Sequence, residues 1–516
     1  MDAFTMIPTA NSLRHAITAG MVLSGTVCWA PPVTADPPPI VYSVAHSFSQ
    51  TDGAYPSATG LLAQGRNGNV YGTTPDGGQH GCGTAFRLSP NRTVFKKIYD
   101  FPPKLCHPQG GLTLGADGLL YGTSQGTGKG QAAIFKLSST GKPHTLRLLS
   151  PAEGAKPESP PIQGANGLFY GVMSSGGSSN DGTLYQIGPK GGSFKVLHNF
   201  QPTDGTNPMG PLAIGLDGKL YGTATFGGPT TEGPNPYGTF FSFDPKIGLT
   251  VLHTFQFDHM NPRNESAKPN GPLTRDYQGA FWGTTYGYYA SGGPGFDYGS
   301  AFYVKLTPPV SVQIRVFDDL TTMNPTAGLT LVPALEGFVG AGSQQAAHAG
   351  SLYLFHLSND FPYANIEYLL GFGKPAEGAT PESTLLLHTN GNLFGTTVHG
   401  GNTATATQPS SGYGVIYKLT PTSPAPQATV FAVPQAGSVG QTIGLLGQGF
   451  TDATGKSLVT DVAFGSVHAD PSSIQASAST FLTVTVPAGS ATGHIVVTLS
   501  GGTALQTALP FPVVSR

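Results

Sequence analysis

The chain has 516 residues, enough for two or more domains that each bury a sizeable hydrophobic core. Only 10% of the residues are charged and the formal net charge is −2, so nothing electrostatic favours nucleic acid or an anionic membrane as a partner. Glycine (73 residues) and proline (45 residues) are abundant, and the glycines recur at fixed positions beside Tyr, Phe and Leu. This pattern indicates an all-β fold rich in turns rather than a disordered chain.

The first 35 residues have the features of an export signal. Arg14 and His15 precede an apolar stretch of small residues, and Val33-Thr34-Ala35 offers a cleavage site. The apolar stretch, residues 16–30, is shorter than the roughly 20 residues that a membrane-spanning helix needs. We therefore expect a signal peptide over residues 1–35, and a secreted, periplasmic or cell-surface protein whose mature chain has no transmembrane segment.

A short core recurs seven times, at intervals of 49 to 61 residues, and five of the copies consist of an aromatic residue, glycine and threonine. The sixth copy is degenerate and is identified by its place in the series. Each core lies in a unit of four strand-like segments, a to d, which in the second unit are residues 111–115, 119–124, 133–137 and 145–149. The seven cores are Tyr71-Gly72-Thr73-Thr74, Tyr121-Gly122-Thr123-Ser124, Tyr170-Gly171-Val172-Met173, Tyr221-Gly222-Thr223-Ala224, Trp282-Gly283-Thr284-Thr285, Val339-Gly340-Ala341-Gly342 and Phe394-Gly395-Thr396-Thr397.

The turn between segments a and b is the most regular feature of the units. Five of the seven turns are Asn-Gly or Asp-Gly, pairs that tolerate the positive φ angles of a two-residue type I′ hairpin. We therefore expect segments a and b to be antiparallel neighbours joined by such a turn. The turns are Asn67-Gly68, Asp117-Gly118, Asn166-Gly167, Asp217-Gly218, Gln278-Gly279, Glu336-Gly337 and Asn390-Gly391.

Seven four-stranded units of about 50 residues predict a seven-bladed β-propeller over residues 40–420. A linear solenoid is the alternative, but the sequence has no capping repeats with polar outer faces, which solenoids need. The seventh unit lacks a segment d, and a segment of that kind, residues 41–48, precedes the first unit. We expect this N-terminal strand to pair beside residues 414–419 and to close the ring without an unpaired edge.

These units resemble the Gloeobacter/Verrucomicrobia (GloVer) tandem repeat family, whose unit carries D-G-x-L-Y-G-T-T, then G-G, then G-T-x-F. The resemblance covers residues 41–420 and is specific in units 1, 2, 4 and 7, whereas units 3, 5 and 6 depart from the pattern. It implies an exported bacterial protein, and it implies no established activity.

Removal of the signal peptide would leave two cysteines, Cys82 and Cys106. An even number of cysteines in an exported chain suggests a disulfide, and two unrelated thiols are the alternative. Cys82 precedes segment c of the first unit and Cys106 follows its segment d, so antiparallel pairing of c and d would bring them together. The bond would close a loop of about 24 residues and stabilise the fold by about 3 kcal/mol.

The composition changes at the proline-rich residues 421–427, which predict a short stiff linker. Residues 428–516 beyond it predict about seven short strands. They resemble an IPT/TIG domain, an immunoglobulin-like β-sandwich in which glycines shape the turns and alternating apolar residues fill a two-sheet core. The resemblance implies a spacer or a binding module. It rests on residues 437–440, 447–450, 462–465, 484–489, 492–493 and 511–513.

The sequence contains no GxSxG, HExxH or P-loop motif. His198 and His253 occupy matching positions of segment d, which favours a structural role over metal binding. Asp258, His259 and Glu265 are too sparse to predict an acid/base pair or a calcium site. We therefore predict no catalytic residues, no metal and no cofactor.

The b–c and d–a loops of a propeller lie on one face, and in the fifth unit both loops are unusual. The d–a connection is long, from Gln256 to Asn270, and the b–c loop is rich in aromatic residues. Exposed aromatic rings stack on sugars and anchor protein partners, although the same rings could instead pack beneath the loop. We predict ligand contact at Tyr237, Tyr286, Tyr288, Tyr289, Phe296 and Tyr298.

These observations favour an exported, monomeric, non-enzymatic binding or cell-surface protein, with a polysaccharide or another surface protein as its ligand. The alternative is a carbohydrate-active hydrolase or lyase on the same face, for which paired carboxylates about 5–10 Å apart would be expected. A structural spacer is a third reading, in which the aromatic side chains would be buried.

Overall fold

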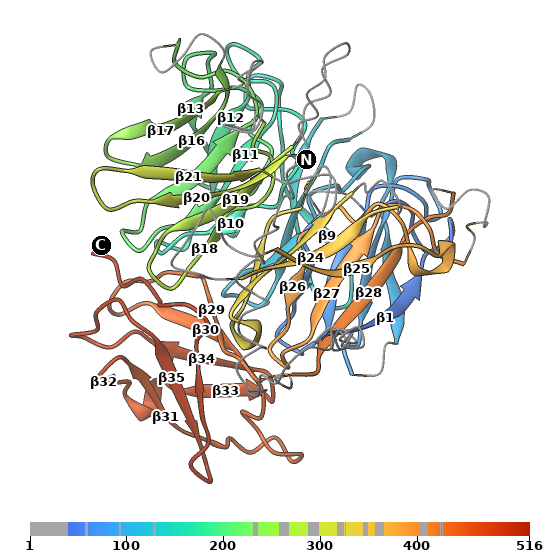
Figure 1. Ribbon diagram of the computed structural model, residues 1–516. Coiled ribbons are helices and arrows are strands. Elements are labelled where there is room, and N and C mark those ends of the chain that lie inside the picture. Colours follow the sequence, from blue (N-terminus) through green and yellow to red (C-terminus); the bar gives the residue numbers. More distant parts are fainter. Residues whose placement is uncertain are drawn as a thin grey trace, which may run out of the picture. The chain divides into compact units, whose positions relative to one another are not determined.

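The computed structural model describes residues 40–515 (Figure 1) apart from residues 57–59, 92–93, 127–130, 231–235, 257–267, 287–298, 317–324, 326, 344–348, 357–365, 403, 405–410, 424 and 426. The predicted signal peptide lies outside the described residues. Strands form nearly all of the regular structure, so the fold is all-β. The described residues contain no helix long and apolar enough to cross a membrane. The helical segments described are the 3₁₀ turns η1 (Pro103–Leu105), η3 (Pro333–Leu335), η4 (Pro375–Glu377) and η5 (Pro471–Ser473).

The described strands between residues 40 and 421 form seven four-stranded antiparallel sheets, which we number 1 to 7 in chain order. In sheets 1 to 6 the four strands lie side by side in the order of the sequence. Sheets 1 to 3 consist of β2 (Ala63–Gln64), β3 (Val70–Thr74), β4 (Thr84–Leu88) and β5 (Phe95–Asp100); β6 (Leu112–Leu114), β7 (Leu120–Ser124), β8 (Ala133–Leu137) and β9 (Pro143–Leu148); and β10 (Ile162–Gln163), β11 (Phe169–Met173), β12 (Thr183–Ile187) and β13 (Lys195–Asn199).

The remaining sheets of this region follow the same plan, with longer outer strands in sheet 4. Sheets 4 to 7 consist of β14 (Ala213–Ile214), β15 (Leu220–Ala224), β16 (Pro236–Asp244) and β17 (Gly248–Gln256); β18 (Thr274–Arg275), β19 (Phe281–Thr285), β20 (Ser300–Lys305) and β21 (Ser311–Val316); β22 (Thr330–Val332), β23 (Gly337–Gly342), β24 (Ser351–His356) and β25 (Ile366–Gly371); and β26 (Leu386–Leu387), β27 (Leu393–Thr397), β28 (Val415–Pro421) and β1 (Ile40–Ser47).

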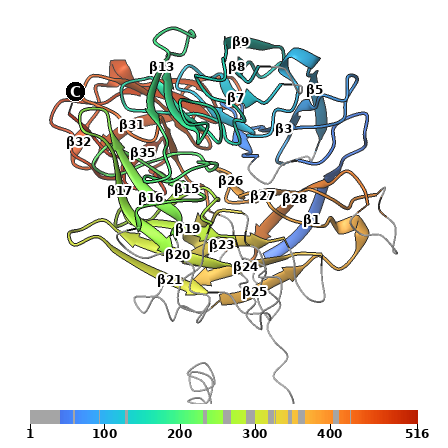
Figure 2. The same cartoon turned by 90° about the horizontal axis from the view of Figure 1, so that it is seen from above.

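Sheet 7 takes its fourth strand from the start of the described chain. β1 pairs antiparallel with β28, with Ile40 opposite Pro421 and Ser47 opposite Val415. Figure 2 shows β1 beside β28 and β27. This is the pairing that the sequence predicted for residues 41–48, and it gives β28 a neighbour on both sides.

Consecutive sheets contact one another near the start of their first strands. Between sheets 1 and 2, Leu61 N donates to Gly110 O (3.2 Å) and Leu112 N donates to Leu61 O (3.0 Å). Between sheets 6 and 7, Thr330 Oγ1 donates to Leu385 O (2.7 Å). The first strands of all seven sheets also line one cavity.

The recurring aromatic-Gly-Thr core has a physical role at each of its positions in sheet 1. The Tyr71 hydroxyl accepts a hydrogen bond from Asn67 Nδ2 in the preceding turn (2.9 Å). A Cβ on Gly72 would lie 2.4 Å from the Phe86 ring on the neighbouring strand β4. Thr73 Oγ1 donates to Pro108 O at the start of sheet 2 (2.7 Å). The core therefore fixes the turn, the strand pairing and the contact with the next sheet.

The glycine of the core meets the same obstacle in every sheet. A Cβ there would lie 2.3 to 2.8 Å from the aromatic ring of the third strand, so any side chain would overlap that ring. This includes Gly340 of the degenerate sixth copy, which faces Tyr353. The glycines are Gly72, Gly122, Gly171, Gly222, Gly283, Gly340 and Gly395.

The turn between the first and second strands is not the two-residue type I′ hairpin that we expected. In sheet 1, Gly65 N donates to Asn69 O (2.9 Å) and Gly68 N donates to Gly65 O (2.9 Å), so the loop has three residues. Within this turn only Gly68 has a positive φ, of 74°, whereas a type I′ turn needs two such residues. The Asn67 carboxamide instead accepts a hydrogen bond from Asn69 N (3.2 Å). The turn is therefore a type I turn followed by a left-handed glycine.

The described residues beyond 427 form two more four-stranded antiparallel sheets. Both sheets contribute side chains to one apolar core that includes Ile443, Val462, Val484 and Val497. The first sheet has the order β29 (Phe431–Val433), β30 (Thr442–Leu446), β34 (Phe481–Thr485), β33 (Gln475–Ala478), and the second has the order β32 (Val467–His468), β31 (Val459–Phe464), β35 (Ile495–Leu499), β36 (Ala504–Gln506).

Candidate functional site

Two of the six residues predicted to contact a ligand are among the described residues. Tyr237 is the second residue of β16 and Tyr286 directly follows β19, and both side chains are half-buried. The other four predicted contacts and the sparse acidic group around His259 lie outside the described residues. Those positions are Tyr288, Tyr289, Phe296 and Tyr298, and Asp258, His259 and Glu265.

Lys268 joins the two described tyrosines through its main chain. Lys268 N donates to Tyr237 O (2.9 Å), and Lys268 O accepts from Tyr286 N (3.0 Å). The Lys268 ammonium lies 5.7 Å from the centroid of the Phe226 ring, whose residue is 40% exposed. Loops of sheets 4 and 5 therefore meet in a small aromatic surface formed by Phe226, Tyr237, Lys268 and Tyr286, which we call the sheet 4/5 surface.

Lys268 is one of six residues that share a position and a conformation in the repeats. Each precedes a proline in the loop that leads to a first strand, and each has a positive φ between 51° and 65°. Such angles are costly for residues other than glycine. The sequence analysis missed this feature, which recurs as a small residue, a variable residue and proline. The six residues are Tyr55, His107, Lys156, Asn207, Lys268 and Thr380.

Five of these left-handed residues join their own sheet to the one before it. In these five the main-chain N–H donates to a carbonyl oxygen near the start of the third strand of the preceding sheet. Thr380 N, for example, donates to Ala349 O (2.6 Å). In five of the six the carbonyl accepts from the residue after the second strand of its own sheet, as Lys156 O does from Ser174 N (3.1 Å). Two constraints on one residue explain why the strained angle is retained.

Four of the six side chains also contact the preceding sheet. Asn207 Nδ2 donates to Ser174 O (3.0 Å). The Tyr55 ring lies 5.5 Å from the His399 ring, between centroids. His107 Nδ1 lies 3.2 Å from Asp76 Oδ1. The fourth is the contact of Lys268 with the Phe226 ring. In the part of the chain that the structure describes, Lys156 differs from these four because its side chain is exposed.

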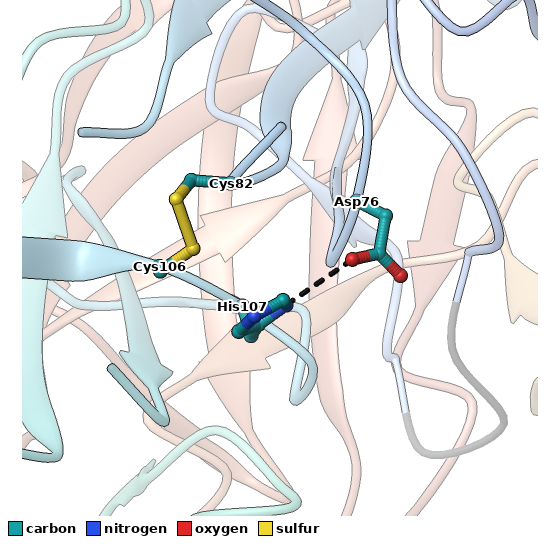
Figure 3. Close-up of a disulfide and its surroundings, with 4 residues drawn as sticks. All are labelled: Asp76, Cys82, Cys106 and His107. Carbon is teal, nitrogen blue, oxygen red and sulfur yellow. Dashed lines mark ion pairs between the residues drawn. A yellow bond between two sulfur atoms is a disulfide. The ribbon is translucent and has the colours of Figure 1, made fainter. Parts of the chain in front are cut away.

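A disulfide joins Cys82 and Cys106, whose Cα atoms are 4.4 Å apart (Figure 3). Both residues are buried. His107 N donates to Cys82 O (3.1 Å), so the disulfide spans the same junction of sheets 1 and 2 as this main-chain hydrogen bond. The Asp76–His107 pair lies beside it (Figure 3). The disulfide therefore reinforces a junction that the other repeats hold without one.

Two half-buried glutamates occupy equivalent positions, each two residues after a left-handed residue. Burial raises the pKa of Glu158 to about 7, although nearby Lys156 and a hydrogen bond from Gln125 Nε2 (3.2 Å) favour its charged form. Burial also raises the pKa of Glu382 to about 7. The sequence analysis missed both residues, because the burial that perturbs them depends on how neighbouring sheets meet.

The histidines of the fourth strands have structural partners. His198 Nε2 lies 2.6 Å from Asp204 Oδ2, and Asp204 Oδ1 accepts from Gln201 N (2.6 Å). His46 and Asp52 form the same pair at 3.1 Å on β1. Across the described ranges, no three His, Cys, Asp or Glu side chains converge in a way that could hold a metal ion.

The Gloeobacter/Verrucomicrobia repeat matches residues 25–163 and 107–353, which together make up more than half of the chain. The chain belongs to this repeat family. The comparison with curated proteins gave no match.

Solved structures with a similar fold include several enzymes. A fungal alcohol oxidase of the AA5 family, in complex with copper, is 15% identical with a TM-score of 0.50, over 90% of this chain and 98% of that chain. A putative 6-phosphogluconolactonase from Bacteroides fragilis is 15% identical with a TM-score of 0.42, over 64% and 88%. TolB from Acinetobacter baumannii is 14% identical with a TM-score of 0.34, over 61% and 64%. At these identities the first similarity concerns the fold alone, and the other two are weaker.

Proposed function

We propose that this GloVer repeat protein is an exported, non-enzymatic binding protein whose ligand is a polysaccharide. In this proposal a signal peptide over residues 1–35 directs export. Residues 40–420 form a seven-bladed β-propeller closed by β1, and residues 421–427 link it to an immunoglobulin-like sandwich over residues 428–516. The ligand binds the face formed by the loops between second and third strands and by the loops that lead to first strands.

The propeller in this proposal is supported by the contacts between sheets. Each of the seven sheets has four antiparallel strands, and the first strands all line one cavity. Sheet 7 returns to sheet 1 through Gln64, whose side-chain Nε2 donates to Thr389 Oγ1 (2.8 Å). A linear solenoid would leave its first and last units apart, so this contact favours a ring.

The observation that carries the binding proposal is the junction at Lys268. Its two main-chain hydrogen bonds hold Tyr237 and Tyr286 together, and Phe226 beside them is 40% exposed. These bonds fix the backbones that carry the two rings, so less conformational freedom is lost when a sugar ring stacks there than on an unpaired loop. The sheet 4/5 surface therefore has the rigidity and the amphipathic character that sugar recognition requires.

A binding screen against glycans and polysaccharides tests this proposal, using residues 36–516. We expect Phe226→Ala and Tyr286→Ala each to weaken binding at least tenfold. Tyr277→Ala is the matched control, because Tyr277 is 38% exposed and lies in the turn at the opposite end of sheet 5. No binding by the wild-type protein, or equal binding by all variants, would reject the sheet 4/5 surface. Binding to surface proteins but not to glycans would reassign the ligand class.

A carbohydrate-active hydrolase or lyase on the same face is the second candidate. The observation that favours it is the Glu158 carboxyl, whose pKa of about 7 suits a general acid at neutral pH. Release of reducing sugar by the wild-type protein and its loss in Glu158→Gln, but not in Glu367→Gln on β25, would support an enzyme. Binding without any product would leave the non-enzymatic function.

A further inference from the structure

A cavity of about 360 Å³, which we call the central cavity, lies where the first strands of the seven sheets meet. Its wall includes residues of every first strand, from Ala63 in β2 to Leu387 in β26. Residues 431–435 and 508–509 complete the wall. The volume falls within the range of small-molecule pockets in proteins.

Most of the cavity wall is apolar, with leucine as the commonest residue. Leucine side chains come from four sheets, and Ile162 and Ile214 come from two more. Phe431 and Val433 of β29 add apolar side chains from the C-terminal region. A wall of this kind offers an occupant dispersion contacts with leucine, isoleucine, phenylalanine and valine side chains.

Two of the three glutamines in the wall, Gln64 and Gln163, form side-chain hydrogen bonds within the protein. Gln64 Nε2 donates to Thr389 Oγ1 (2.8 Å), and Gln64 Oε1 accepts from Thr389 N (3.0 Å). Gln163 Oε1 accepts from Ala116 N (2.8 Å), and Gln163 Nε2 donates to Gly167 O (3.1 Å). Neither carboxamide is left to bind a polar group inside the cavity.

Three of the four threonines in the wall also form hydrogen bonds within the protein, and one of them, Thr384, accepts through Oγ1 from Gly328 N (2.8 Å). Thr330 Oγ1 donates to Leu385 O (2.7 Å), and Thr274 Oγ1 donates to Leu329 O. The Thr330 and Thr274 bonds each join one first strand to the segment that leads into the next, so the hydroxyls hold the ring of strands together. Water inside the cavity would therefore find few partners, and a cavity that cannot satisfy water binds apolar molecules instead.

The C-terminal segment that completes the wall is held by a buried arginine. Arg275 is 7% exposed, and its guanidinium donates to Ile214 O of sheet 4 (2.9 Å) and to Pro510 O (2.6 Å). Pro510 directly follows Leu509, which lines the cavity. The contact fixes this part of the wall in place, so the cavity has a preformed shape.

We propose that the central cavity binds one small apolar molecule of hydrocarbon character. The volume, the mostly apolar wall and the internal hydrogen bonds of Gln64, Gln163, Thr274 and Thr330 together carry this proposal. It does not depend on the sheet 4/5 surface, because the two sites share no residue. Loss of sugar binding and loss of apolar binding are therefore separate outcomes.

Titration with N-phenyl-1-naphthylamine, a fluorescent apolar probe, tests the proposal on the mature chain. We expect saturable binding with one site per chain and displacement of the probe by 1-decanol. Leu331→Trp, which fills the cavity from β22, should weaken binding at least tenfold. Leu148→Trp is the matched control, because Leu148 is 48% exposed on β9 and should leave binding unchanged. Absence of saturable binding, or equal binding by both variants, would overturn the proposal.

A second measurement guards against misfolding of Leu331→Trp. Crystals of the wild-type protein pressurised with xenon should show the gas inside the central cavity, since xenon enters dry apolar cavities. Xenon at this site would support the proposal even if the variant does not fold. A cavity filled with ordered water and free of xenon would overturn it.

Discussion

Gln64 and Thr389 lie 325 residues apart in the sequence and form two hydrogen bonds with each other. Gln64 Nε2 donates to Thr389 Oγ1 at 2.8 Å, and Thr389 N donates to Gln64 Oε1 at 3.0 Å. Both side chains are almost fully buried. The pair joins sheet 1 to sheet 7.

Replacement of Gln64 by Ala should lower the free energy of unfolding by about 2 kcal/mol, because it leaves the buried Thr389 N–H without an acceptor. The Thr389 hydroxyl would keep its bond from Gln448 Nε2 (2.6 Å), so the main-chain donor accounts for most of the loss. Chemical denaturation measures the change, with the exposed Gln79→Ala as control. A loss no larger than that of the control would contradict the role of this pair.

Gly72→Ala should destabilise the protein by about 2 kcal/mol, because overpacking a fitted core costs roughly 1–3 kcal/mol. The added Cβ would lie 2.4 Å from the Phe86 ring. Gly192→Ala is the control, since no atom lies within 4 Å of its Cβ position and its φ is not left-handed. Melting temperatures of the two variants should therefore diverge. Equal melting temperatures would mean that Gly72 is not required to avoid overlap with the Phe86 ring.

Reduction of the Cys82–Cys106 disulfide should destabilise the protein by about 3 kcal/mol in the chain-entropy estimate for its 24-residue separation. Unfolding of the reduced protein should begin at the junction of sheets 1 and 2, where His107 N donates to Cys82 O. Melting curves with and without dithiothreitol measure it. The double variant Cys82→Ser/Cys106→Ser should melt at the temperature of the reduced wild-type protein, and dithiothreitol should not change its melting temperature. An unchanged melting temperature of the wild-type protein would count against this prediction.

The Glu158 carboxyl should make stability fall as the pH rises. Its folded-state pKa is about 7, above the usual value of 4.5, so the folded protein holds a proton that the unfolded chain releases between these values. Relative to high pH, the protonated Glu158 carboxyl stabilises the folded protein. This contribution is fully present below pH 4.5 and is lost as the pH rises through 7. We expect Glu158→Gln to raise stability at pH 8 by about 1–2 kcal/mol, after allowance for partial solvent screening.

The control for the Glu158 experiment is Glu336→Gln, because Glu336 is exposed. Between pH 5 and pH 8, the free energy of unfolding of the wild-type protein and of this control should change by the same amount. Glu158→Gln should show a smaller slope, and Glu382→Gln should behave in the same way, since burial raises its pKa to a similar value. A steeper slope in Glu158→Gln would contradict the direction of the shift.

Much of the all-β architecture could be predicted from the sequence because the residue types of the repeated core depend on contacts between neighbouring strands. Gly72 and its equivalents mark strands whose neighbours carry a large ring, and residues 41–48 share the pattern of a fourth strand. The type of turn could not be predicted. Asn-Gly suits two kinds of hairpin, and the choice depends on the backbone angle of Asn67, which the residue type alone does not determine.

The candidate site was less predictable than the strands. Aromatic content drew attention to Tyr237 and Tyr286, but the residue that joins them is Lys268, which has no distinctive side-chain pattern. Its signal is the proline that follows it in the repeat. The burial of Glu158 likewise arises only when two sheets meet, so its raised pKa has no local sequence signature.

The pairing of β1 with β28 also constrains the order in which the protein can fold. β1 is made first, yet its partner, Val415–Pro421, is synthesised only after all the other strands of the repeat region. Until then a growing polypeptide exposes β1 as an unpaired edge, which is a template for pairing with other chains. Completion of sheet 7 therefore has to follow synthesis of the whole repeat region. A polypeptide that stops before Val415 would lack the partner of both β1 and β27 and should be prone to aggregate.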